Sequence, residues 1–279
     1  MSYLTTAENT TTAKPKPPVT LSTLNKRKAN GEKFSCLTCY DSTFAAAMQT
    51  AEIDTVLIGD SLGMVVQGHS DTLPVTMDDM VYHTANVARG VQNALLIADM
   101  PFMSYSDVKS ACLNAGRLMA AGAKMVKIEG GDWLCDTVKQ LNRNGIPVCA
   151  HLGLTPQSVH LFGGFRIQGR DAQRAEEIYH HALALQAAGV QMVVLECIPD
   201  QLAERITKAL RIPVIGIGAG AQTDGQVLVM QDAIGVTTGY IPKFSKNFLA
   251  ETGDIRKAIE LYVEQVANGQ FPAAEHTFN

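Results

Sequence analysis

The segment Ala121-Gly-Ala-Lys-Met-Val-Lys-Ile-Glu129 recurs in altered form 67 residues later, as Ala188-Gly-Val-Gln-Met-Val-Val-Leu-Glu196. Each copy is typical of a glycine that ends a helix, followed by a buried strand that ends in glutamate. A second match follows at an offset of 66, where Ile146-Pro-Val148 parallels Ile212-Pro-Val214. A repeated pair of βα units favours an α/β fold with a closed parallel barrel, the (β/α)8 TIM barrel. A doubly wound open sheet is the alternative, and no topological switch point marks one.

Apolar runs at barrel spacing predict the remaining strands, with helix start and stop signals between them. The predicted strands are 34–40, 55–60, 95–99, 125–129, 147–152, 192–197, 213–218 and 226–236. The first predicted helix follows the capping-box sequence Thr76-Met-Asp-Asp79 and ends before Gly90. The other predicted helices are 107–122, 132–144, 171–188, 200–211 and 254–268.

Length and composition indicate one large domain. The chain has 279 residues, 46% of them hydrophobic, which suffices for the core of a single barrel. Residues 1–19 are rich in threonine and proline, and we expect a disordered arm there. Residues 20–279 are expected to form the barrel, with an N-terminal helix and a C-terminal helix and tail.

Charge and cysteine usage narrow the function classes. A net charge of −4 argues against a nucleic-acid partner or an anionic membrane surface, and no apolar run approaches the roughly 18 residues of a membrane span. Most of the six cysteines lie inside apolar runs, as buried free thiols do. Cys36 and Cys39 make a single C-x-x-C with no second pair at zinc-site spacing, so we expect a reducing, cytoplasmic location.

Four acids close strand-like runs: Asp60, Asp99, Glu129 and Glu196. One such residue is often only the cap of a turn, but four at equivalent positions favour a shared site at the carboxyl-terminal rim. Lys127 stands two residues before Glu129, so both side chains point to the same face of a strand. A structural salt bridge is the alternative reading of this pair.

The residue types at the rim indicate metal-assisted enolisation of a 2-oxo acid. Asp60, Asp99 and Glu129 offer the oxygen donors that Mg²⁺ prefers, whereas no His or Cys cluster suits zinc. A cation polarises the substrate carbonyl, and a carboxylate free of the metal removes the neighbouring carbon-bound proton. Glu196 is the candidate base, because it comes from a more distant strand. Lys127 is a candidate partner of the substrate carboxylate or the enolate oxygen.

Further candidates lie on the same rim. His151, at the end of the fifth strand, is either a satisfied core histidine or a hydrogen-bond donor to substrate. The segment from Ser61 to Val75 is long enough to be an active-site loop. Gly216-Ile-Gly-Ala-Gly220 is compatible with a phosphate site or with close strand–helix packing. His180-His181 lies mid-helix and is expected on the solvated surface.

Several motifs together resemble the 3-methyl-2-oxobutanoate hydroxymethyltransferase (ketopantoate hydroxymethyltransferase) family, from about residue 21 to the C-terminus. They are Val56-Leu-Ile-Gly-Asp-Ser-Leu-Gly-Met64, Gly68-His-Ser-Asp-Thr-Leu-Pro-Val75, Ala98-Asp-Met-Pro-Phe102, Val126-Lys-Ile-Glu-Gly-Gly131, His151-Leu-Gly-Leu-Thr-Pro-Gln157, Gly216-Ile-Gly-Ala-Gly220 and Lys246-Asn-Phe-Leu-Ala250.

The resemblance implies a Mg²⁺-dependent barrel of the phosphoenolpyruvate/pyruvate superfamily that acts in pantothenate and coenzyme A biosynthesis. It implies hydroxymethyl transfer from 5,10-methylenetetrahydrofolate to 3-methyl-2-oxobutanoate, giving 2-dehydropantoate, with the enolate attacking the methylene carbon of an iminium form of the folate. It also implies a homo-oligomer, typically a decamer in bacteria.

Residue by residue, the resemblance implies Asp60 and Asp99 as metal ligands that also contact substrate, and Glu129 as an acid of the metal shell. Ser61, Lys127 and His151 correspond to substrate contacts and Glu196 to the base.

Two other functions stay open on the sequence. A carbon–carbon lyase or phosphonomutase of the same superfamily would need a catalytic loop cysteine or a phosphate clamp, and neither is evident. A non-catalytic barrel that binds a metal or metabolite would have no need of an unliganded base.

Overall fold

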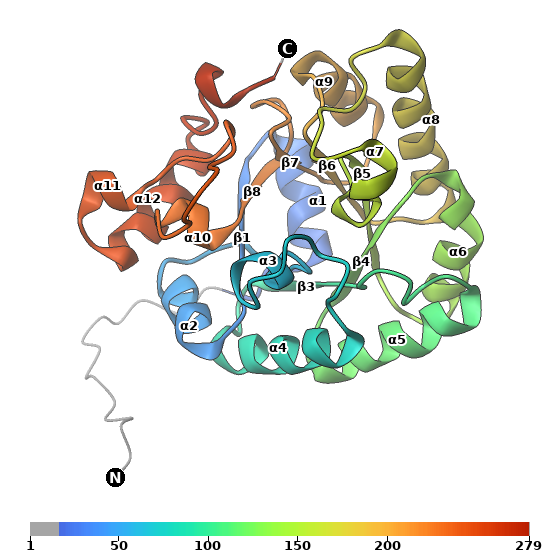
Figure 1. Ribbon diagram of the computed structural model, residues 1–279, viewed down its shortest axis with the longest axis horizontal. Coiled ribbons are helices and arrows are strands. Elements are labelled where there is room, and N and C mark those ends of the chain that lie inside the picture. The colour runs from blue at the N-terminus through green and yellow to red at the C-terminus, as the bar shows by residue number, and fades with distance from the viewer. Residues whose placement is uncertain (1–16, 279) are drawn as a thin grey trace.

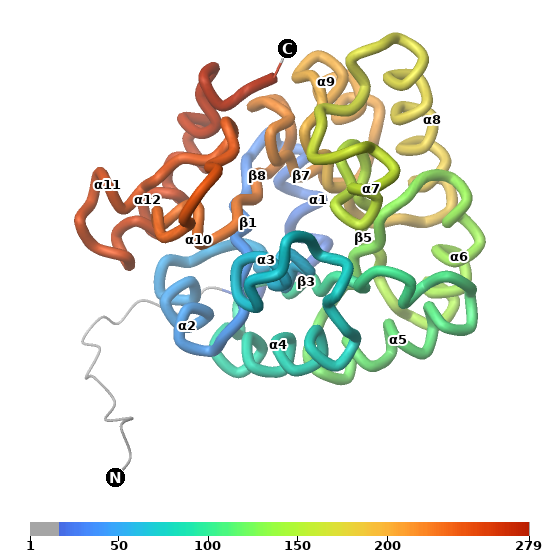
Figure 2. The backbone as a smooth tube through the Cα atoms, in the orientation of Figure 1, coloured from blue at the N-terminus to red at the C-terminus, as the bar shows by residue number. Residues whose placement is uncertain are grey.

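Eight parallel strands form a closed barrel in the computed structural model, which describes residues 17–278. Each strand pairs with the next along the chain, and β8 pairs with β1 to close the ring. The chain therefore passes once around the barrel, as the colours of Figure 2 show. The strands are β1 Phe34–Thr38, β2 Thr55–Ile58, β3 Leu95–Asp99, β4 Met125–Glu129, β5 Val148–Gly153, β6 Met192–Glu196, β7 Val214–Ile217 and β8 Gly225–Leu228. The predicted barrel is confirmed.

Helices surround the barrel on its outer side and also lie at its two ends (Figure 1). They are α1 Leu21–Asn30, α2 Ser42–Thr50, α3 Leu62–Val65, α4 Met77–Gly90, α5 Val108–Ala121, α6 Cys135–Arg143, α7 Val159–Phe162, α8 Ala172–Ala188, α9 Asp200–Ala209, α10 Met230–Ala233, α11 Leu249–Thr252 and α12 Ile255–Ala267. Short 3-10 turns are η1 Asp132–Leu134, η2 Pro156–Ser158 and η3 Ala274–His276.

The alternation of side chains along the strands separates two cores. On β4, Met125 packs in the apolar cluster inside the barrel, whereas Val126 and Ile128 pack in the cluster between strands and helices. Lys127 and Glu129 share the inward face with Met125, because successive strand residues point to opposite sides. The strand register places Asp99 of β3 beside Lys127 and His151 of β5 beside Glu129.

Local signals fix most helix ends where they were predicted. Thr76 forms the predicted capping box with Asp79 at the start of α4. Asp107 accepts hydrogen bonds from the backbone N–H groups of Lys109 and Ser110 at the start of α5. Both caps supply partners for N–H groups that the first helical turn leaves unsatisfied.

Several predicted elements differ in extent, and the strands predicted over 34–40 and 55–60 end two residues early, at Thr38 and Ile58. The strand predicted over 226–236 is wrong beyond Leu228, because β8 ends there and Met230–Ala233 is helical. The N–H of Met230 donates to Oγ1 of Thr38 at 3.0 Å, so the backbone leaves the strand ladder at this point. The helix predicted over 132–144 begins as the η1 turn and continues as α6.

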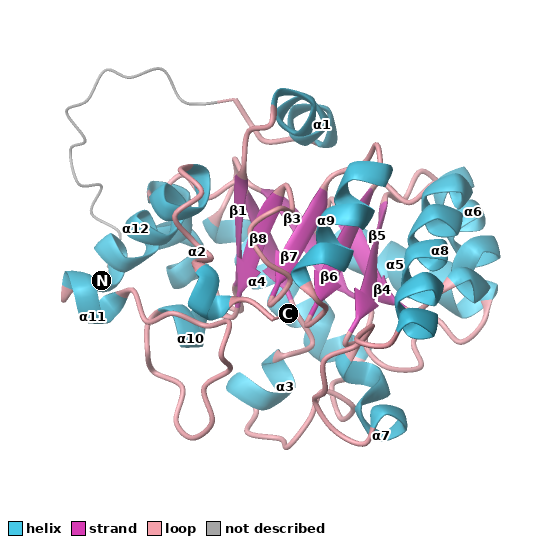
Figure 3. Ribbon diagram, turned by 90° about the horizontal axis from the view of Figure 1, so that it is seen from above, coloured by secondary structure: helices cyan, strands magenta, loops and turns pink. Residues whose placement is uncertain are grey.

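Helix α1 closes the end of the barrel opposite to α3 and α7, as Figure 3 shows. Its Leu24 is fully buried and packs with the inner cluster. Arg27 pairs with Asp54 at 2.8 Å and Lys28 with Asp224 at 2.7 Å, which fixes the helix across the amino-terminal ends of the strands. This end is therefore filled, and a cavity is possible only at the other.

The arm predicted for residues 1–19 lies almost wholly outside the described residues, so it stays a prediction, as does the single domain over 20–279. None of the helices within residues 17–278 combines the length and the apolarity needed to cross a membrane.

Candidate active site

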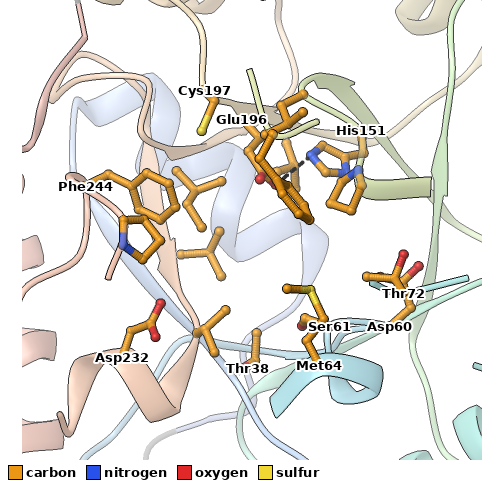
Figure 4. Close-up of a pocket in the computed structure, with 18 of the residues that line it drawn as sticks. Thr38, Asp60, Ser61, Met64, Thr72, His151, Glu196, Cys197, Asp232 and Phe244 are labelled. Carbon is orange, nitrogen blue, oxygen red and sulfur yellow. Dashed lines mark ion pairs between the residues drawn. The ribbon is translucent and has the colours of Figure 1, made fainter. Parts of the chain in front are cut away.

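All seven predicted site residues line one cavity of about 890 Å³ at the carboxyl-terminal ends of the strands. They are Asp60, Ser61, Asp99, Lys127, Glu129, His151 and Glu196. Figure 4 shows Asp60 and Ser61 on one side of this cavity, with His151 and Glu196 together beside them. The strand-end pattern therefore brings these side chains into one space.

Lys127 lies between two carboxylates at the bottom of the cavity. Its Nζ is 2.9 Å from Oδ1 of Asp99 and 3.5 Å from Oε1 of Glu129. Burial alone would lower the pKa of Lys127, but Asp99, Glu129 and Asp60 outweigh it and raise that pKa above its ordinary value. The ammonium group therefore stays charged and holds the two acids together.

His151 joins a third acid to this group. Its Nδ1 lies 2.9 Å from Oε1 of Glu129, and its Nε2 lies 3.2 Å from Oε2 of Glu196. Burial and the charge of Lys127 lower the pKa of His151, but Glu129 and Glu196 prevail and raise it to about 9. At neutral pH His151 is therefore a cation, and the pKa of Glu129, which burial would raise, is lowered by His151 and Lys127.

Asp60 and Asp99 are the acids with the least compensation. The N–H of Asp60 donates to Oδ2 of Asp99 at 3.1 Å, so the two residues are in contact. Burial is the largest cause that raises the pKa of Asp60, and Asp99 and Glu129 add to it. Burial also raises the pKa of Asp99, although Lys127 offsets part of the effect. Both carboxylates would be stabilised as anions by an added cation.

Glu196 differs from the other acids in its exposure. Its side chain is 16% exposed, whereas the side chains of Asp99 and Glu129 are 3% and 2% exposed. Apart from His151, no hydrogen-bond or ion-pair partner holds its carboxylate among the described residues. Of these three acids, Glu196 is therefore the one whose carboxylate is most accessible from the cavity.

Two residues of the site were missed by the sequence reasoning. The amide Nε2 of Gln157 donates to Oδ2 of Asp60 at 2.8 Å and to the carbonyl of Met100 at 2.9 Å. The backbone N–H of Gln157 donates to Oε2 of Glu129 at 3.0 Å. Tyr105 donates its hydroxyl proton to Oε1 of Gln157 at 2.5 Å, which fixes the orientation of the amide. Gln157 thus links acids from two strands.

A residue that follows the first strand holds the side chain of Ser61 in place. Its Oγ lies 2.8 Å from the hydroxyl of Tyr40, just beyond the end of β1. Its backbone carbonyl accepts from the N–H of Met64 at 2.9 Å, within the segment that precedes Val75. Met64, Val65, His69 and Thr72 of that segment line the cavity.

The donor set fits Mg²⁺ through two carboxylates. No group of three or more His, Cys, Asp or Glu residues in the described chain is arranged to hold a metal ion. Both oxygens of Glu129 already have partners, namely His151 with Lys127, and the N–H of Gln157, and both oxygens of Asp99 have partners in Lys127 and the N–H of Asp60. Mg²⁺ commonly uses one or two carboxylates with waters and substrate oxygens, so Asp60 and Asp99 suffice. Direct ligation by Glu129, expected from the sequence, stays a prediction.

The charges of the site also fit a divalent cation. Four carboxylates face two cations, Lys127 and His151, which leaves two negative charges in a buried space when all acids are ionised. One Mg²⁺ would neutralise them.

Other candidates have structural roles. A Cβ at Gly216 would come within 2.6 Å of Thr223, and one at Gly220 within 2.7 Å of Asp200, which favours the packing reading of this motif. His181 is half-buried and accepts a hydrogen bond from the N–H of Asp132 at 3.2 Å, so its expected solvation is wrong, while His180 is exposed. Burial raises the pKa of the Cys36 and Cys39 thiols to about 12.

Residues 18–274 match the protein family described as ketopantoate hydroxymethyltransferase. The chain is 85% identical to 3-methyl-2-oxobutanoate hydroxymethyltransferase of Tolumonas auensis over 94% of this chain and 99% of that protein. It is 64% identical to the protein of the same name from Aeromonas hydrophila, again over 94% and 99% of the two chains.

Solved structures agree in fold. Phosphonopyruvate hydrolase in complex with oxalate and Mg²⁺ superposes with a TM-score of 0.60 at 12% identity, over 92% of each chain. 2,3-Dimethylmalate lyase, a member of the PEP mutase/isocitrate lyase superfamily, superposes with a TM-score of 0.57 at 16% identity, over 88% of this chain and 98% of that one. At such identities the likeness concerns the barrel alone.

Proposed function

The chain belongs to the ketopantoate hydroxymethyltransferase family, and we propose that it transfers a hydroxymethyl group to 3-methyl-2-oxobutanoate in pantothenate biosynthesis. The donor in this proposal is 5,10-methylenetetrahydrofolate and the product is 2-dehydropantoate. The observation that carries the proposal is the cluster of Asp60, Asp99, Lys127, Glu129, His151 and Glu196 in one cavity.

Asp60 and Asp99 would hold Mg²⁺ at the bottom of this cavity. The cation, when bound, polarises the 2-oxo group of the substrate and stabilises the charge that develops on its oxygen. Lys127 is charged and lies 2.9 Å from Asp99, so it adds a second positive group beside that oxygen. Ser61, on the same side of the cavity, is the proposed donor to the substrate carboxylate.

Glu196 is the proposed base that removes the proton from C3 of the substrate. Its side chain is more exposed than those of Asp99 and Glu129, and Nε2 of His151 lies 3.2 Å from its Oε2. The electron pair of the broken C–H bond moves into the enolate, and the proton passes to Glu196. His151 also orients this carboxylate, because Glu129 holds the other side of its ring at 2.9 Å.

The second half of the reaction forms the carbon–carbon bond. C3 of the enolate bonds to the methylene carbon of the donor, both C–N bonds of the methylene bridge break, and tetrahydrofolate is released. Water supplies the hydroxyl group of the product and one hydrogen of tetrahydrofolate, and the proton held by Glu196 supplies the other. The donor carries a methylene carbon without oxygen, whereas the product carries a hydroxymethyl group, so one water is consumed for each turnover. A cavity that is open to solvent at Glu196 gives that water access.

NMR tests both halves separately. Exchange of the C3 proton of 3-methyl-2-oxobutanoate is followed in D₂O with and without Mg²⁺, and then with the folate donor added. We expect metal-dependent exchange without donor and 2-dehydropantoate once the donor is present. Exchange without product would favour a lyase of the same fold. The absence of both exchange and product would contradict an enzymatic function.

We also infer that the chain assembles with copies of itself and acts in the cytoplasm. Large apolar side chains stand exposed near α5, among them Met103 at 62% and Leu113 at 63%, which a second copy could cover. Sedimentation velocity tests the expected decamer, and cell fractionation tests the location.

A further inference from the structure

The cavity is much larger than the 2-oxo acid requires. 3-Methyl-2-oxobutanoate has eight non-hydrogen atoms, which would fill about 240 Å³ even at the roughly 30 Å³ that one water takes in the liquid. The cavity volume is about 890 Å³. Most of the space therefore lies outside the cluster of acids and is available to a second molecule of larger size.

The outer wall differs in chemistry from the bottom. On one side it is formed by the loop between α7 and α8, with Phe165, Arg166 and Arg170. On the other side Tyr240 and Phe244 line it, and Figure 4 shows Phe244 across the cavity from Glu196. Aromatic faces and guanidinium groups thus surround the entrance, whereas four of the five carboxylates of the cavity gather at the bottom. The fifth, Asp232, accepts hydrogen bonds from the hydroxyls of Thr237 and Ser245.

The arginine loop is fixed beside the proposed base. The backbone N–H of Gln168 donates to the carbonyl of Cys197 at 2.9 Å, and Cys197 directly follows Glu196. The side-chain amide of Gln168 donates to the carbonyl of Arg166 at 3.0 Å. A ligand that reaches Glu196 from the entrance therefore passes this loop.

Arg166 and Arg170 have no acidic partner within residues 17–278. Lys243, a third cation of the wall, donates to the carbonyl of Thr277 at 2.7 Å and lies 5.5 Å from the ring centre of Phe278. The other two cations are thus available to an anionic ligand, and a guanidinium group can bind a carboxylate through two parallel hydrogen bonds.

We propose that Arg166 and Arg170 bind the glutamyl carboxylates of the folate donor, while Phe165, Tyr240 and Phe244 pack against its ring system. The inference rests on the proposed function, because it assigns the donor of that reaction to the outer part of the same cavity. Aromatic side chains suit the flat rings of a folate, and Tyr240 and Phe165, at 85% and 53% exposed, have uncovered faces.

Binding of tetrahydrofolate and of tetrahydropteroate, which lacks the glutamate, tests the assignment by titration calorimetry. We expect Arg166→Ala and Arg170→Ala each to weaken tetrahydrofolate binding by about 5- to 10-fold, as loss of one charge pair would. Tetrahydropteroate binding should change less than twofold, because it offers no such carboxylate. Arg211→Ala removes an exposed arginine outside the cavity and is the matched control.

Kinetics separate this inference from the proposed function. The KM for the donor should rise in both variants, while the KM for 3-methyl-2-oxobutanoate and the donor-independent C3 exchange stay at the parent values. Arg170→Lys should recover part of the loss. Two results would overturn the inference: equal binding of the two folates by the parent, or an unchanged donor KM in the Arg166→Ala/Arg170→Ala protein. Neither result would contradict the proposed transferase function. A parent that forms no product would overturn both.

Discussion

The two ends of the barrel both bury charged side chains, but they balance those charges differently. At the amino-terminal end Asp54 pairs with Arg27, and Asp224 pairs with Lys28. At the carboxyl-terminal end four carboxylates share two cations, Lys127 and His151. The charges of the first end balance within the chain, whereas those of the second leave two negative charges when all four acids are ionised.

The difference shows which charges serve the fold. Asp54 also accepts the backbone N–H of Ser35 at 2.9 Å, and Asp224 accepts that of Val214 at 2.8 Å, so these acids anchor strands. In parallel barrels the amino-terminal face generally serves stability and the opposite face serves chemistry. Substitutions at the two ends should therefore separate activity from stability.

Loss of the proposed base should have the largest effect. Glu196→Gln keeps the size of the side chain and removes the proton acceptor, so we expect kcat to fall by about 10²- to 10⁴-fold, or roughly 3 to 5 kcal/mol. The melting temperature should stay within about 2 °C of the parent value, because the side chain of Glu196 is more exposed than those of Asp99 and Glu129. Steady-state product formation and calorimetry measure the two quantities. Retention of near-parent kcat would remove Glu196 from this role.

Breaking the opposite end should destabilise without affecting the chemistry. Asp224→Ala leaves the N–H of Val214 without its acceptor and Lys28 with only the carbonyl of Thr207, and we expect a loss of about 2–4 kcal/mol in the free energy of unfolding. Urea titration measures it, and kcat of the folded protein should not change. Asp136→Ala, which removes an exposed i,i+3 pair with Lys139, is the control and should cost less than about 0.5 kcal/mol. Equal costs in both variants would contradict the role given to Asp224.

Gln157→Leu tests how the carboxyl-terminal end is held in place. The change removes the hydrogen bonds to Asp60 and Met100 at nearly constant volume, and the backbone contact to Glu129 remains. Residues that orient metal ligands typically contribute 10- to 100-fold in metal affinity, so we expect Mg²⁺ to bind about that much more weakly. Titration calorimetry with Mg²⁺ measures it, and Gln173→Ala on exposed α8 is the control. Unchanged Mg²⁺ affinity with a lowered melting temperature would reduce Gln157 to a packing residue.

The smallest effect is expected at the start of α1. Thr20 caps this helix through a capping box with Thr23, so Thr20→Ala should cost about 1 kcal/mol in the free energy of unfolding. The same urea titration measures it, with kcat as the second readout. A loss as large as that of Asp224→Ala would show that the cap, and not the ion pairs, holds α1 on the barrel.

The acids of the site could be predicted because strand ends are visible in the sequence. An apolar run of four or five residues that stops at a charge gives both the end of a strand and, by alternation, the face of the last side chain. Asp99, Glu129 and Glu196 follow that rule, whereas Asp60 lies two residues beyond the end of β2. The eighth strand was predicted too long, because the apolar run continues through Met230–Ala233 after the backbone has turned into a helix.

Contacts made by loops could not be predicted in this way. Gln157 lies in the η2 turn and Tyr105 between β3 and α5, where no strand register tells what a side chain meets. The sequence likewise shows that Glu129 can offer carboxylate oxygens to a metal. It does not show that His151 and Gln157 already contact both of these oxygens. Such information arises only when β2, β4 and the turn after β5 come together.

One measurement addresses the contrast between the two ends most directly. Exchange of the C3 proton of 3-methyl-2-oxobutanoate is followed by NMR in D₂O at saturating Mg²⁺, for the parent, Glu196→Gln and Asp224→Ala, at a temperature where all three are folded. The account predicts exchange in the parent and in Asp224→Ala at equal rates per folded molecule, and little or none in Glu196→Gln. Exchange at the parent rate in Glu196→Gln, or its loss in folded Asp224→Ala, would contradict the assignment of the chemistry to the carboxyl-terminal end.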